Sequence, residues 1–289
     1  MQAHQLERHG VTTGDHESGQ RLFLRRILAE GAERLRVTLS GDMVFGWRDR
    51  TIGSAALRQD GRFWLRATAE HRDWAQGEAW NGNPDAADIT GVPKPLLINR
   101  VEWSEPPVEM YAELMTYVSD TPCSPTPDLR EAITLPDAWW TDLREALNTL
   151  AGHPTERGDH DADAYLRELG DTYERPLALP PPAMRTEHTD LHWSNLTRPR
   201  LWILDWEYWG RAPAGFGVAT LYLHSLLVPD MAGQVHDEFA DLLASPTGQV
   251  AQLGAAAHIL SRSYRVDDYA ELQHPVRRHV RRLLGEDRV

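Results

Sequence analysis

The chain has 289 residues, of which 41% are hydrophobic, so it can bury a large core as one domain or two lobes. Its formal net charge of −13 argues against a nucleic-acid binder, and either suits a cationic ligand or only keeps the protein soluble. No apolar run approaches the roughly 20 residues of a membrane helix, residues 1–20 lack a secretory-signal pattern, and the lone Cys123 cannot form an internal disulfide. We therefore expect a cytoplasmic protein that does not bind membranes.

The first part of the chain predicts a β-rich lobe. Residues 1–20 show no hydrophobic period and predict a flexible tail. An apolar stripe through Leu22, Phe23, Ile27 and Leu28 predicts a helix over residues 21–32. Strands are expected at residues 43–47, 54–57, 63–66, 95–103 and 110–118, with a helix at 74–80. Residues 21–118 are thus interpreted as one lobe.

The rest of the chain predicts a mostly helical lobe. Residues 119–128 contain three prolines and are interpreted as a hinge or linker, and residues 129–289 form the second lobe. Helices are expected at residues 137–150, 164–173, 218–227, 235–243, 249–263 and 267–284. This order predicts a two-lobed α+β protein with its site in the cleft between lobes.

One short segment carries the chemistry. It reads His188-Thr189-Asp190-Leu191-His192-Trp193-Ser194-Asn195, and Leu201-Trp202-Ile203-Leu204-Asp205 follows. Leu196-Thr197 and Leu201–Leu204 predict a short hairpin that returns Asp205 to the side of Asn195. Phosphoryl transfer can use such a set, with Asp190 as the base for a hydroxyl and Asn195 and Asp205 as oxygen ligands of magnesium.

This segment resembles the aminoglycoside phosphotransferase-like branch of the protein kinase-like fold. That branch carries a catalytic loop His-Gly-Asp-x-x-x-x-Asn and then a hairpin ending in Ile-Asp-Trp or similar. The individual residues match closely from His188 to Gly215, whereas elsewhere only the order of the expected elements matches. It implies ATP and Mg²⁺ as cofactors, a nucleotide and a small-molecule acceptor as partners, and phosphorylation of a hydroxyl. Acceptors would be amino-sugar antibiotics, with a role in resistance, or sugars or amino alcohols, and the acidic charge favours a cationic one.

The resemblance also implies a nucleotide site in the first lobe. The third-strand position that usually holds a lysine is Arg66, for which Glu78 on the next helix would be the partner. The backbone of Leu114 and Thr116 would meet adenine. Lys94, the only lysine, lies in a Pro-Lys-Pro loop that suits the phosphate role poorly.

Some roles and alternatives stay open. His188 is interpreted as an anchor of the loop, and Glu207 as a second support for the metal or the acceptor. Thr189 replaces the usual glycine and would strain the loop if a left-handed conformation were needed. Thr189 and Arg66 together leave open the alternative of a catalytically degraded kinase that binds nucleotide and has a regulatory role. His188, Asp190 and His192 could instead be zinc ligands of a hydrolase, completed by Asp205 or His224.

Overall fold

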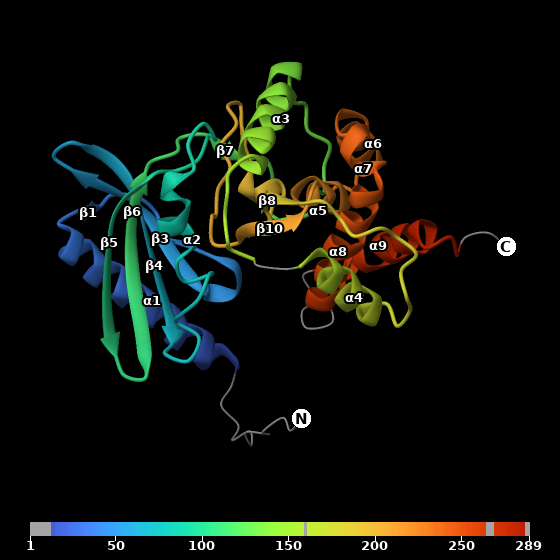
Figure 1. Ribbon diagram of the computed structural model, residues 1–289. Coiled ribbons are helices and arrows are strands. Elements are labelled where there is room, and N and C mark those ends of the chain that lie inside the picture. Colours follow the sequence, from blue (N-terminus) through green and yellow to red (C-terminus); the bar gives the residue numbers. More distant parts are fainter. Residues whose placement is uncertain (1–12, 159–160, 264–268, 287–289) are drawn as a thin grey trace. The chain divides into compact units, whose positions relative to one another are not determined.

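The computed structural model describes residues 13–158, 161–263 and 269–286, and these fold into two compact units (Figure 1). Unit 1 extends to Gly77 and also contains Leu96–Val118. Unit 2 contains Glu78–Pro95 and the chain from Ser119 onward. Residues 78–95, which the sequence assigned to the first lobe, therefore pack with the second. The expected linker, residues 119–128, also belongs to unit 2.

Unit 1 is an antiparallel sheet with one long helix against it (Figure 1). The strand order is β1-β3-β4-β6-β5, and β2 pairs with β3. The elements are α1 (Thr13–Leu35), β1 (Thr38–Leu39), β2 (Val44–Phe45), η1 (Trp47–Asp49), β3 (Thr51–Arg58), β4 (Gly61–His71), β5 (Leu97–Glu105) and β6 (Val108–Thr116). The strands that the sequence predicted are all present in this sheet.

Helix α1 lies on the sheet through one apolar stripe. Leu24, Ile27 and Leu28 are fully buried, as expected for positions spaced three and four residues apart on a helix. Gly31 allows close contact, because a methyl group there would collide with the Cβ of Ala112 on β6. The predicted tail is wrong for residues 13–20, which belong to α1, and residues 1–12 lie outside the described residues.

Unit 2 is mainly helical. Its helices are α2 (Gly82–Asp85), η2 (Ala86–Asp88), α3 (Asp137–Ala151), α4 (Ala162–Thr172), η3 (Trp193–Asn195), α5 (Phe216–His224), α6 (Pro229–Glu238), α7 (Ala240–Leu243), α8 (Pro246–Ser263) and α9 (Ala270–Leu283). Its strands are β7 (Thr121–Pro122), β8 (Met184–His188), β9 (Thr197–Arg198) and β10 (Trp209–Pro213). The expected helix at residues 74–80 is absent, because this stretch forms turns before α2.

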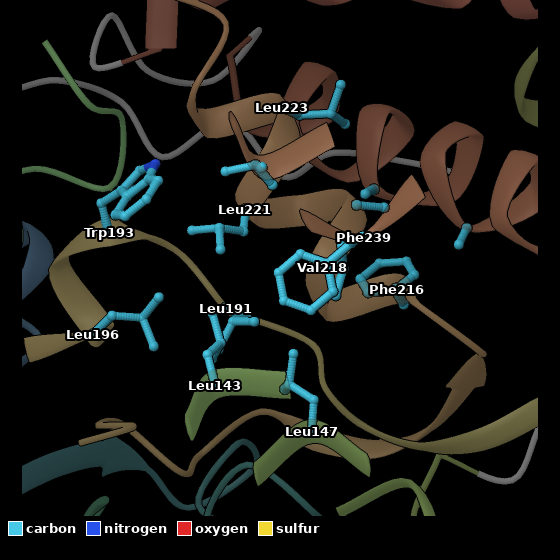
Figure 2. Packing of buried hydrophobic residues seen from close by; sticks show 14 of the residues in the cluster. Leu143, Leu147, Leu191, Trp193, Leu196, Phe216, Val218, Leu221, Leu223 and Phe239 are labelled. Carbon is cyan, nitrogen blue, oxygen red and sulfur yellow. The ribbon is translucent and has the colours of Figure 1, made fainter. Parts of the chain in front are cut away.

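The core of unit 2 supports the segment singled out above. Figure 2 shows Leu143 and Leu147 of α3 in the same buried cluster as Leu191 and Leu196, which directly follow Asp190 and Asn195 in the sequence. Leu143, Leu191 and Leu196 are fully buried. Burial of these leucines fixes the backbone between them, since each contributes about 2 kcal/mol of apolar burial. No helix among the described residues is long and apolar enough to cross a membrane.

Candidate functional site

Two paired strands hold the ends of the candidate catalytic loop together. Strands β8 and β10 are antiparallel, with His188 opposite Trp209. The amide of Thr189 extends this pairing by donating to the carbonyl of Tyr208, with N and O 3.1 Å apart. Residues 189–208 therefore form one loop whose two ends are held together by the pairing of β8 and β10. Asp190, Asn195 and Asp205, the three predicted polar residues, all lie in this loop.

The return from Asn195 to Asp205 has the predicted course. Leu196 and Ile203 form an antiparallel bridge, and the amide of Leu204 donates to the carbonyl of Asn195 at 2.8 Å. The second expected strand is reduced to that bridge, although the amide of Thr197 still donates to the carbonyl of Trp202 at 3.2 Å, and Thr197 and Arg198 also pair with β7. Asn195 and Leu204 are thus backbone partners, which places Asp205 one residue from this contact.

His188 connects the strand to the loop. Its side chain is fully buried, and Nε2 lies 3.1 Å from both the Leu204 and the Asp205 carbonyl oxygens. Since carbonyls only accept, Nε2 carries the proton and donates to both. Burial lowers the pKa of His188, so it is neutral near pH 7. These contacts agree with the anchoring role expected for it.

The donor set at Asn195 and Asp205 fits magnesium. The Asn195 Nδ2 atom donates to the carbonyl of Asp190 at 3.0 Å, so the amide oxygen Oδ1 is the atom left for a ligand. Asp205 adopts a left-handed conformation with φ of 60°, a geometry that aspartate and asparagine tolerate better than most residues. An amide oxygen and a carboxylate are hard ligands of the kind Mg²⁺ prefers.

Asp190 is a largely buried carboxylate, with its side chain 13% exposed and positively charged or polar neighbours on both oxygens. Oδ1 lies 3.2 Å from Arg262 Nη1, and Oδ2 lies 3.4 Å from His192 Nε2. Burial raises the pKa of Asp190, but His192 and Arg262 outweigh it, so the net pKa is well below the usual range. Asp190 is therefore ionised at neutral pH and can accept a hydrogen bond from a hydroxyl.

His192 sits between the two candidate residues. Its Nε2 lies 3.3 Å from Asn195 Nδ2 and 3.4 Å from Asp190 Oδ2. A proton on Nε2 would favour the contact with the carboxylate, whereas an unprotonated Nε2 would accept from the amide. His192 is thus in contact with both candidate side chains.

Thr189 does not strain the loop. Among the described residues, the non-glycine positions with positive φ include Asp205 but not Thr189. The glycine usual before the catalytic aspartate is therefore not required here, and threonine fits the backbone. One of the two sequence features that suggested a degraded kinase is removed by this geometry.

Lys94 lies beside the Asp205 segment, which the sequence did not predict. The carbonyl of Pro93 accepts from the amide of Ile203 at 2.8 Å, and Lys94 Nζ is 5.7 Å from the centre of the Trp206 ring. The side chain is 3% exposed, and burial lowers the pKa of its amine. The only hint in the sequence was that the single lysine is held between two prolines.

Glu207 and Glu78 are tied to one arginine in unit 2. Arg157 Nη2 donates to the backbone carbonyls of Glu78 at 3.0 Å and Glu207 at 3.3 Å. The Glu78 carboxylate accepts from the amide of Gly158 at 2.8 Å. Glu78 lies in a turn rather than on the expected helix, and it has a structural partner within unit 2. A metal or acceptor role for the Glu207 side chain stays a prediction.

Arg66 stands next to a different carboxylate in unit 1. In the register of β4 and β6 it lies opposite Glu113, which is 1% exposed and pairs with Arg100 at 2.8 Å. Glu113 is thus a cross-strand neighbour of both arginines. This arrangement was not expected, because the sequence pointed to Glu78 as the partner. A phosphate role for Arg66 stays a prediction.

The two predicted adenine contacts are engaged in the sheet. Leu114 lies inside β6 and is paired on both sides, with Leu65 and Asn99. The amide of Thr116 donates to the carbonyl of Leu96 at 2.9 Å, and the Thr116 hydroxyl accepts from the amide of Leu96. Strand pairing of β6 ends at Thr116, and an adenine contact at Leu114 and Thr116 stays a prediction.

The zinc-hydrolase alternative lacks its ligand set. Within the part of the chain that the structure describes, no group of three or more His, Cys, Asp and Glu side chains is arranged to hold a metal ion. Structural and catalytic zinc sites need three or four converging protein ligands. His188 uses its Nε2 on backbone carbonyls instead.

Comparison with known proteins identifies the fold. The sequence matches no protein-family profile and no curated protein. A thermostable mutant of aminoglycoside phosphotransferase APH(4)-Ia superposes with a TM-score of 0.59 at 13% identity, over 86% of this chain and 97% of that one. Spectinomycin phosphotransferase APH(9)-Ia, in complex with ADP and spectinomycin, gives 0.51 at 10% identity over 92% and 94%. A putative fructosamine-3-kinase from Haemophilus somnus 129PT gives 0.52 at 9% identity over 89% and 99%.

These neighbours share the protein kinase-like fold, and the chain has that fold, with a β-sheet N-terminal region and a helical C-terminal region. At these identities the likeness is one of architecture. The residues of the site must carry any argument about activity.

Proposed function

We propose that the protein is an ATP- and Mg²⁺-dependent kinase that phosphorylates a hydroxyl group of a small molecule. The observation that carries this proposal is the loop of residues 189–208 between the paired strands β8 and β10. Within this loop the side chain of Asn195 contacts the backbone of Asp190 and its carbonyl accepts from Leu204, the residue before Asp205, although 15 residues separate Asp190 from Asp205. The fold shared with small-molecule phosphotransferases supports it.

The reaction follows from the chemistry of these groups. The acceptor hydroxyl donates to Asp190, its oxygen forms a bond to the γ-phosphorus, and the bond between that phosphorus and the bridging oxygen of ADP breaks. The hydroxyl proton passes to Asp190 and then to solvent. Because the transition state is loose, Asp190 contributes mainly by orienting the hydroxyl rather than by strong basicity, which suits a carboxylate of low pKa.

Magnesium would be held by Asn195 Oδ1 and Asp205, and it would neutralise charge on the nucleotide phosphates. Asn195 is oriented for this by its own Nδ2 contact with the Asp190 carbonyl. His188 and the Leu204 amide keep the two ligands at a fixed separation. Arg66 is proposed to contact the phosphates, with Glu113 in place of Glu78 as its neighbour.

Titration of ATP into the full chain, with and without Mg²⁺, tests the nucleotide site. We expect binding that strengthens with Mg²⁺ in the wild type and does not strengthen in Asp205→Asn. Acceptor-dependent ADP release, abolished in Asp190→Asn, would establish the kinase. Absence of ATP and GTP binding under all conditions would reject the proposal. Mg²⁺-dependent binding without turnover on a broad acceptor panel would indicate a non-catalytic, regulatory protein.

A further inference from the structure

A small cavity lies against Asp190 inside unit 2. It has a volume of about 10 Å³, room for roughly one water molecule. Its polar lining, besides Asp190, comes from the candidate catalytic loop, α5, α8 and the residue just before α9: Thr189, Thr220, His224, His258, Arg262 and Tyr269. Since the acceptor hydroxyl must reach Asp190, this cavity marks where the rest of the acceptor begins.

Arg262 is the charged group of this lining that faces Asp190. Its Nη1 is 3.2 Å from Asp190 Oδ1, and its side chain is 28% exposed. Tyr269 also interacts with the guanidinium. A guanidinium has five N–H donors in a planar fork, and these two contacts leave donors for a bidentate partner such as a carboxylate or phosphate.

His224 provides a second, independent indication of a ligand. The residue is 2% exposed, it lines the cavity, and its Nδ1 has no hydrogen-bond partner among the described residues. A buried polar atom without a partner is costly and rare unless something binds there. Its ring lies between those of His192, at 5.6 Å, and Tyr269, at 5.8 Å, so it is held at the cavity wall.

The lining is poorly suited to a cation. An amine would need a carboxylate other than Asp190, and among the residues that the structure describes Asp190 is the only acidic side chain that lines the cavity. The amine would also face the Arg262 guanidinium. Hydroxyl, imidazole and guanidinium donors instead complement oxygen anions. The net charge of −13 belongs to the whole chain and does not describe this cavity.

We propose that the acceptor carries an anionic oxygen group, a carboxylate or a phosphate, that binds Arg262 next to the hydroxyl to be phosphorylated. Arg262 is then the residue that determines specificity. A ligand anion on the guanidinium would draw it from Asp190 Oδ1 and leave that oxygen to accept the acceptor hydroxyl. This inference rests on the proposed kinase function and replaces the cationic acceptor expected from composition.

Four three-carbon compounds test the charge preference in the full-length protein: glycerate, glycerol 3-phosphate, glycerol and the amine serinol. Their affinities can be measured by calorimetry in the presence of Mg²⁺ and a non-hydrolysable ATP analogue. We expect at least one anion to bind about tenfold or more tighter than glycerol and serinol. The two anionic compounds distinguish a carboxylate from a phosphate.

Variants assign the preference to Arg262. Arg262→Gln should abolish it, and Arg262→Lys should restore part of it, because lysine keeps the charge without the fork. Arg175→Gln is the matched control, since Arg175 is an exposed arginine paired with Glu286 away from the site. Equal or tighter binding of serinol, survival of the preference in Arg262→Gln, or no anion binding up to about 10 mM would overturn the inference.

The same experiments separate the two proposals. Failure to bind ATP together with Arg262-dependent anion binding would reject the kinase function alone. Mg²⁺-dependent ATP binding and turnover of amine acceptors in preference to anionic ones would reject the anionic acceptor alone.

Discussion

The His188 anchor makes a prediction that can be worked out from its contacts. In His188→Phe the ring is kept, so its edge contact with Trp206, 5.1 Å between ring centres, can persist. The Nε2 proton is lost, and with it the donor to the carbonyls of Leu204 and Asp205. The substitution therefore removes the tether of the Asp205 segment and keeps an aromatic ring there, although the phenyl ring is somewhat larger than imidazole.

The expected loss of stability follows from the groups left behind. A buried polar group without its partner costs about 1–3 kcal/mol. The variant leaves two carbonyl oxygens without this donor, but it also removes Nδ1 of His188, which has no partner among the described residues. These effects partly offset each other, so we expect the free energy of unfolding to fall by about 1–2 kcal/mol.

Urea unfolding followed by tryptophan fluorescence measures this change, because most of the eleven tryptophans lie in unit 2. ATP titration with and without Mg²⁺ adds a functional readout, and only the Mg²⁺-dependent part of the affinity should weaken. His236→Phe is the matched control, since His236 is 51% exposed on α6. If His188→Phe matches the wild type in both measurements, His188 does not hold the Asp205 segment.

Three further predictions concern single side chains. Asp205→Asn should keep its fold, because asparagine tolerates the left-handed backbone at φ of 60°. In thermal unfolding, Asp205→Ala should be about 1 kcal/mol less stable than Asp205→Asn. Equal stabilities of the two variants would contradict this prediction. His279, whose Nε2 donates to Gln252 Oε1 at 2.9 Å, has its pKa lowered to about 4 by burial and nearby Arg282. As pH falls, the His279 imidazole binds a proton in the unfolded chain before it does so in the folded protein. Its contribution to the free energy of unfolding is therefore fully present above pH about 6.5 and is lost as pH falls through about 4, by up to about 3 kcal/mol. His279→Gln should flatten this part of the urea-unfolding profile, and an unchanged slope would refute the assignment. Leu143→Ala removes a fully buried side chain of α3 and should lower the free energy of unfolding by about 2–5 kcal/mol, and a loss below about 1 kcal/mol would show that the core beneath Leu191 is loose.

The spacing of residues close together in the sequence was sufficient to predict the elements that short-range interactions determine. The stripe of Trp139, Trp140, Leu143 and Leu147 predicted a helix at 137–150, and α3 spans Asp137–Ala151. The spacing of Asn195 and Asp205 around a short turn predicted their return to each other, because a chain that reverses within a few residues has few other courses. The kinase-like fold followed from the same segment and is confirmed.

Local pattern failed where long-range contacts decide the structure. Residues 13–20 have no apolar period, yet they continue α1, whose later turns are fixed by packing on the sheet. Glu78 was assigned to a helix beside Arg66, but its carboxylate is held by Gly158, 80 residues away in sequence. Interactions of that range leave no periodic signal in the sequence.

The sequence by itself determined the motif chemistry of this protein: Asp190, Asn195 and Asp205 lie within one short stretch whose backbone geometry follows from local spacing. Only the tertiary structure decided what surrounds Asp190. Arg262 is 72 residues away and His224 lies on another helix, and each meets the cavity only because α5 and α8 pack together. Net charge is a sum over the whole surface, whereas ligand preference depends on the few groups that folding brings within hydrogen-bonding distance.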